Sequence, residues 1–126
     1  MATRCLIGKI VDYEMVKYIY CHFDGYPEGV GECLTINWRD SRKVNALLSK
    51  GDLNSLGSKL KDKNKSNSRL HTQFSNYSEN HQLVSKLDYE SSSWLEKDWW
   101  DIEYIYLFID GKWHCKGFNT DWFELD

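Results

Sequence analysis

Cysteine and histidine are the residues of this chain with the most specific chemistry, and they form two adjacent pairs. His22 follows Cys21, and Cys115 follows His114. Thiolate and imidazole are common zinc ligands, and a thiol beside a base can act as a nucleophile. Neighbouring residues of a strand point to opposite faces, so only one member of each pair can serve one site, with Cys5 as a third sulfur ligand. Because no C-x-x-C pair occurs, we expect buried, reduced thiols and no metal or other cofactor.

A carboxylate pair is the second candidate for chemistry. Asp24 and Glu28 could serve as acid and base, or Asp24 could cap a turn while Glu28 stabilises the start of a helix. The sequence lacks the motifs of phosphate loops, dinucleotide folds, serine hydrolases and zinc proteases. We therefore expect a protein without enzymatic activity.

The composition indicates one domain over residues 1–126. Of its 126 residues, 41% are hydrophobic and 28% are charged, and no apolar run approaches the ~20 residues of a membrane span. The N-terminus lacks the apolar core of a secretion signal, so we expect a cytoplasmic protein. The net charge of −3 argues against direct binding to nucleic acid.

Charge and aromatic residues are distributed unevenly along the chain. Residues 38–69 hold nine basic and three acidic residues, whereas residues 88–126 hold three basic and ten acidic residues together with five of the six tryptophans. Two solvated faces of opposite sign would explain the charges alone. An acidic surface with aromatic anchors would explain both features and predicts these partner-binding residues: Asp98, Trp99, Trp100, Asp101, Glu103, Asp121, Trp122 and Glu124.

Two hairpins are indicated by β-branched and aromatic runs. The first covers residues 4–11 and 16–23, and the second covers residues 102–109 and 112–118 around an Asp-Gly dipeptide typical of a type I′ turn. Between them, apolar residues at helical spacing predict helices over residues 30–38 and 41–50, and a capping box predicts a third over residues 94–100. Residues 58–82 are polar, and we expect a long mobile loop there.

These elements predict an α+β fold, an antiparallel sheet with two or three helices packed on one face. We expect the helices to cover the aliphatic side of the strands, namely Ile19 and Cys21 on one strand and Ile105 and Leu107 on another. The opposite face would then be rich in tyrosine and either covered by residues 58–101 or open as an alternative ligand face: Tyr18, Tyr20, His22, Tyr104 and Tyr106. Arg4 and Lys17 would lie near that face to meet a phosphate.

Residues 18–31 read Tyr-Ile-Tyr-Cys-His-Phe-Asp-Gly-Tyr-Pro-Glu-Gly-Val-Gly, and a Gly-Asp-Leu-Asn-Ser-Leu-Gly run follows at residues 51–57. With Thr3-Arg4 near the start and the strand from Glu103 to Trp113, the chain resembles a family of small proteins from phages and prophages of low-GC Gram-positive bacteria. The match covers about half of the chain. Relatives carry an aromatic and basic run in the middle that residues 70–81 lack, so the role of that run does not transfer.

The resemblance implies an accessory protein that acts inside a bacterial host. Combined with the acidic and aromatic segment, it leads us to expect a protein that binds and inhibits a host macromolecule, such as a CRISPR-type defence effector, by presenting carboxylates in place of phosphates. The alternative is a module that sequesters a small molecule or nucleotide on the tyrosine face. A homo-oligomeric structural protein is a third interpretation.

Overall fold

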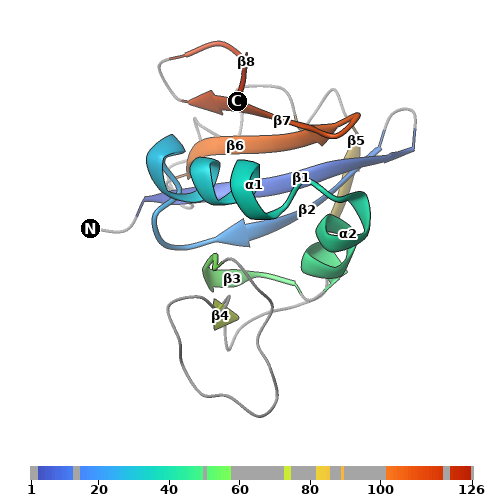
Figure 1. Ribbon diagram of the computed structural model, residues 1–126, viewed down its shortest axis with the longest axis horizontal. Helices are drawn as coiled ribbons and strands as arrows, with labels where there is room; N and C mark the ends of the chain where they lie inside the picture. Colours follow the sequence, from blue (N-terminus) through green and yellow to red (C-terminus); the bar gives the residue numbers. More distant parts are fainter. Residues whose placement is uncertain are drawn as a thin grey trace.

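The computed structural model describes residues 3–12, 15–49, 51–57, 73–74, 82–85, 89, 102–117 and 120–125. These residues form one eight-stranded mixed sheet in the order β4-β3-β2-β1-β6-β7-β8, with β5 paired to β2 (Figure 1). The strands are β1 Arg4–Asp12, β2 Met15–Cys21, β3 Leu53–Ser55, β4 Gln73–Phe74, β5 Gln82–Ser85, β6 Ile102–Ile109, β7 Lys112–Gly117 and β8 Phe123–Glu124. The helical segments are the single π-helical turn η1 Pro27–Gly31, α1 Glu32–Asn37 and α2 Ser41–Ser49.

The α+β class is confirmed, but the sheet is mixed rather than antiparallel. The β1–β2 and β6–β7 pairs are antiparallel hairpins, and Asp110 and Gly111 take the positive φ values that a type I′ turn requires. β1 and β6, however, run parallel, as do β2 and β3. β2 also ends at Cys21, two residues before the expected end; beyond it the N–H groups of His22 and Phe23 donate to the β3 carbonyls of Leu53 and Asn54, and the chain then turns at Asp24, which has a φ of 59°.

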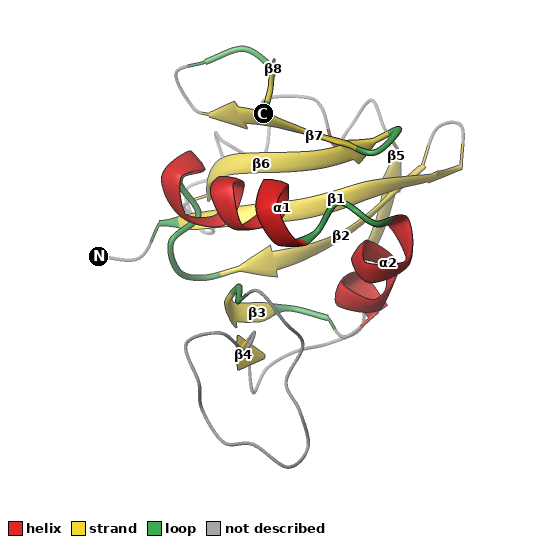
Figure 2. Cartoon of the chain, viewed as in Figure 1, coloured by secondary structure: helices red, strands yellow, loops and turns green. Residues whose placement is uncertain are grey.

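The helical segments lie over one face of the sheet, as expected (Figure 2). Pro27 starts η1, where its missing N–H costs no hydrogen bond. The Asp40 carboxylate caps α2 by accepting from the Arg42 N–H at 2.8 Å, and Gly51 follows α2 with φ of 88°. None of the helices among the described residues is long and apolar enough to cross a membrane.

Buried side chains form one cluster on each face of the sheet. The cluster under the helices joins helix residues such as Leu34 and Leu47 to Ile7, Ile19 and other strand residues. The cluster on the opposite face includes Leu6, Val16, Tyr18, Tyr89, Ile102, Ile105 and Leu107. Tyr89, from the segment before β6, is fully buried there and donates its hydroxyl to the Tyr106 carbonyl at 2.6 Å.

Several sequence expectations lie outside the described residues. They include the helix at 94–100 and most of the loop at 58–82, within which only Gln73–Phe74 and Gln82 are described, as parts of β4 and β5.

Candidate functional site

The predicted tyrosine face is divided between the two sides of the sheet. Tyr106 belongs to the cluster under the helices and Tyr104 packs against it, whereas Tyr18 and Tyr20 lie with the opposite cluster. The parallel pairing of β1 with β6 sets Tyr106 beside Ile7, which points toward the helices. The alternation within β6 was therefore predicted correctly, but the side that faces the helices was not. The four tyrosines cannot form one stacking surface.

Three residues considered for that face do meet at the end of β2. The Arg4 Nε–H donates to His22 Nδ1 at 3.4 Å, and the Tyr20 hydroxyl lies 2.8 Å from the same nitrogen. Because arginine can only donate, Nδ1 is an acceptor, and the proton of the neutral ring lies on Nε2. Burial raises the pKa of Tyr20 to about 12, so Tyr20 is a neutral donor to the ring. The three side chains form a closed, half-buried polar cluster.

The cysteines are free thiols in or against the core under the helices. Cys5 lies directly opposite Cys21 in the β1–β2 ladder, and both are fully buried, as is Cys115. Burial raises the pKa of Cys5 and raises that of Cys115 to about 12, so neither thiol supplies a thiolate near neutral pH. Among the described residues no group of three or more His, Cys, Asp or Glu side chains could hold a metal ion.

Half of the predicted acidic and tryptophan surface can be placed. Asp98, Trp99, Trp100 and Asp101 lie outside the described residues. Glu103 is half-buried at the point where the β1–β6 register shifts, and Trp122 packs against the cluster opposite the helices. Asp121 is exposed. Glu124 is 48% exposed and forms an ion pair with Lys112 at 3.1 Å. Part of the Trp122 side chain therefore packs against the core of its own chain.

A surface that the sequence did not single out lies at the turn after β2, residues 22–28, which we call the corner. Two aromatic side chains protrude from it, with Phe23 46% and Tyr26 38% exposed. The exposed Asp24 carboxylate lies between them in sequence and accepts from the Tyr26 hydroxyl at 3.2 Å. Glu28 is exposed one turn further on. The Asp24 carboxylate raises the pKa of Tyr26, which keeps that phenol protonated.

Backbone hydrogen bonds hold the corner from several sides. The Gly25 N–H donates to the Thr3 carbonyl at 2.8 Å, and the Val30 N–H donates to the Asp24 carbonyl at 2.8 Å. The buried Tyr106 hydroxyl donates to the Gly25 carbonyl at 2.6 Å. A Cβ on Gly25 would lie only 2.7 Å from the Thr3 oxygen, so glycine is required for this approach. Asp24 itself has a φ of 59°, which is strained for a non-glycine residue.

The exposed corner could have been suspected from its sequence. Tyr26 lies in an Asp-Gly-Tyr-Pro turn, where no strand or helix periodicity assigns it to the core. Phe23 ends the strand expected over residues 16–23, where alternation with Ile19 and Cys21 assigned it to the core, and this was wrong, because β2 ends at Cys21 and leaves Phe23 exposed. Asp24 and Glu28 were considered as capping residues or as an acid–base pair. In the structure Asp24 binds Val30 through its backbone carbonyl, and its carboxylate contacts Tyr26.

Comparisons of the chain with family models, with curated proteins and with solved structures find no match.

Proposed function

We propose that the protein is a non-enzymatic, phage-type accessory protein that binds and inhibits a host macromolecule, such as a CRISPR-type defence effector, through the acidic and aromatic corner. One observation carries the proposal: Phe23 and Tyr26 are exposed beside the Asp24 and Glu28 carboxylates on a turn that hydrogen bonds hold in place. Such a turn loses little conformational entropy on binding.

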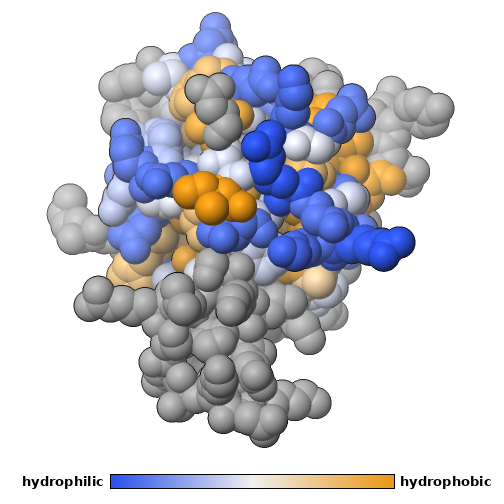
Figure 3. Space-filling model, viewed as in Figure 1, coloured by the Kyte–Doolittle hydropathy of each residue, from blue (hydrophilic) through white to orange (hydrophobic). Residues whose placement is uncertain are grey.

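The chemistry of the corner favours a basic partner. Lysine and arginine side chains bind over aromatic rings and pair with carboxylates, and a channel that holds nucleic acid presents both residue types. Glu32 and Ile36 of α1 are one helical turn apart and extend the surface, with Ile36 67% exposed. Elsewhere on the helix-covered side, hydrophilic residues predominate and apolar ones form small separate patches (Figure 3). Binding at the corner would therefore depend on charge and on a few exposed apolar side chains.

Affinity capture from a bacterial host lysate tests the proposal. The tagged protein is used at low and at moderate salt, captured proteins are identified by mass spectrometry, and the affinity for the purified partner is measured by calorimetry. We expect Phe23→Ala and Glu28→Lys each to weaken binding about tenfold or more, because anchors and charge pairs at an interface centre carry most of the affinity.

The double variant Asp121→Lys/Glu124→Lys is the matched control, since it reverses exposed carboxylates of the originally predicted surface. If this control abolishes binding while the corner variants bind as the wild type does, the corner is not the interface. Failure to recover any partner that depends on Phe23 would refute the proposal as a whole.

A further inference from the structure

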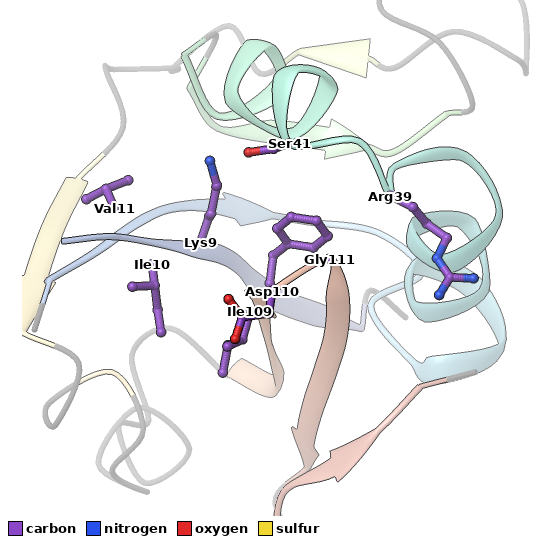
Figure 4. Close-up of a pocket in the computed structure, with 9 residues that line it drawn as sticks. Lys9, Ile10, Val11, Arg39, Ser41, Ile109, Asp110 and Gly111 are labelled. Carbon is purple, nitrogen blue, oxygen red and sulfur yellow. The ribbon is translucent and has the colours of Figure 1, made fainter. Parts of the chain in front are cut away.

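A groove of about 1020 Å³ lies at the other end of β1 from the corner. It is lined by the last residues of β1 and β6, by the turn between β6 and β7 and by the link between α1 and α2 (Figure 4). Open sheets bind ligands beyond the carboxyl ends of adjacent parallel strands, and β1 and β6 are such a pair. The volume is close to the upper end of the roughly 300–1,000 Å³ typical of small-molecule sites.

Lys9 supplies a positive charge on the β1 side of this groove. Its side chain reaches toward α2, where the amino group donates to Asn45 Oδ1 at 2.7 Å (Figure 4). No ion pair joins Lys9 to a carboxylate among the side chains that the structure describes. Lys17 lies directly opposite Lys9 in the β1–β2 ladder, and burial together with this neighbouring charge lowers the pKa of Lys9. An anion bound here would relieve the repulsion between the two lysines.

Arg39 and Ser41 add two more polar groups to the groove. Arg39 is exposed and, within the described part of the chain, its guanidinium has neither an ion pair nor a hydrogen bond. Ser41 is exposed at the start of α2. The N-terminal end of α2 is not itself the phosphate-binding group, because the Asp40 carboxylate already caps it. The Lys9 ammonium suits a phosphate group, and the Arg39 guanidinium, which points away from Lys9 in Figure 4, suits a ring or a hydrogen-bond acceptor of the same ligand.

The remaining groove surface is mixed in character. Phe108 supplies an apolar surface on the side of the helices, whereas Ile10 and Ile109 line the groove from the opposite side of the sheet, where they pack against the second cluster. The exposed Asp110 carboxylate lies on the same groove and would repel a purely anionic ligand, but it can accept from a hydroxyl or an amino group. A ligand that fits must therefore combine a phosphate, an apolar ring and hydrogen-bond donors.

We propose that this groove binds a nucleoside monophosphate, with the phosphate on Lys9, the base against Phe108 and the Arg39 guanidinium, and the ribose hydroxyls on Asp110. The site is separate from the corner, so the proposal stands independently of the partner that the corner binds.

Isothermal titration of the full chain with the four nucleoside 5′-monophosphates, adenosine and inorganic phosphate tests this site. We expect at least one nucleotide to bind about tenfold or more tightly than phosphate or adenosine alone. Lys9→Met and Arg39→Gln should each weaken that nucleotide about tenfold or more, as expected for a lost charge-assisted hydrogen bond. Circular dichroism confirms that each variant is folded.

Lys43→Gln is the matched control, because Lys43 is an exposed cation of α2 outside the groove lining, and it should leave the affinity unchanged. No nucleotide binding, or binding that Lys9→Met and Arg39→Gln leave intact, would overturn the proposal. The proposal would also be overturned if an oligothymidylate bound through Lys9 and Arg39 while none of the mononucleotides bound. Phe23→Ala should bind the nucleotide normally, which separates this test from that of the corner.

Discussion

Aromatic side chains with a polar atom connect the core to the backbone of the corner and the helix ends. Tyr106 is fully buried, yet its hydroxyl reaches the Gly25 carbonyl at 2.6 Å. Trp113 donates from Nε1 to the Trp38 carbonyl at 2.7 Å in the same layer. Irregular backbone under the helices offers carbonyls that need donors, and these two aromatic side chains satisfy them from within a largely aliphatic cluster.

Tyr106→Phe isolates the contribution of one such hydroxyl. The substitution keeps the ring but leaves the buried Gly25 carbonyl without its donor, so we expect a loss of about 1–3 kcal/mol in the free energy of unfolding. Urea denaturation measures it. Tyr104→Phe, at a half-buried phenol that makes no hydrogen bond to any of the described residues, is the control and should cost less than half as much. Equal losses would mean that the Tyr106 bond does not support the corner.

The buried thiols predict how stability depends on pH. Burial raises the pKa of Cys115 from its ordinary value of 9.0 to about 12. The unfolded chain releases this proton first as the pH rises, so the stabilisation is complete below pH 9 and is lost between pH 9 and about 12. In urea titrations this group should contribute about 1.4 kcal/mol per pH unit to the slope, so the slope should be shallower by about that amount in Cys115→Ala, where Cys5 still contributes. The same slope in the variant would exclude Cys115 as its source.

At the scale of elements, the sequence predicted those features that depend on only a few adjacent residues. The Asp110-Gly111 turn and the helix expected over residues 41–50 were both readable, because each depends on the backbone preferences of a few adjacent residues. The helix expected over residues 30–38 is instead divided into η1 and α1 and begins earlier, at Pro27.

The sequence did not predict whether the two hairpins pair through parallel or antiparallel strands. β1 and β6 are separated by some 90 residues, and no turn between them fixes whether they pair in parallel. That one pairing decides which side of β6 meets the helices, and it also places Lys9 and Asp110 on one groove. The groove was missed because a site at the ends of two strands depends on this pairing, whereas the corner was missed because the expected strand ran on to Phe23.

The β1–β2 hairpin contains a pair of like charges, Lys9 and Lys17, whose effect on stability can be tested. Lys17→Met removes the charge opposite Lys9 while keeping the Lys9–Asn45 hydrogen bond, so we expect a gain of a few tenths to about 1 kcal/mol in the free energy of unfolding. The gain should shrink in 0.5 M salt, which screens the repulsion. Lys43→Met on α2 should give no salt-dependent gain. A Lys17→Met gain that persists in high salt would point to packing rather than charge.

At the scale of the whole molecule, the length of β1 separates the corner from the groove. Thr3, just before β1, holds the corner through Gly25, whereas Lys9 near the end of β1 lines the groove. Figure 1 shows β1 running the length of the sheet between these two ends. A strand rises about 3.3 Å per residue, so these two residues are about 20 Å apart. That distance exceeds the screening length of about 8 Å at physiological salt. The acidic corner and the basic groove can therefore coexist on a small domain without neutralising each other.

This separation predicts that the two surfaces bind independently. A protein partner of the corner and a nucleotide in the groove should each bind with the same affinity whether or not the other is present. The double variant Glu28→Lys/Lys9→Met should show the sum of the two single effects to within about 0.5 kcal/mol, as expected for distant sites without shared contacts. Calorimetric titration of the partner with and without saturating nucleotide measures the coupling directly. A larger coupling would mean that β1 transmits a change between its ends, since both surfaces are built on that strand and direct electrostatic interaction is screened.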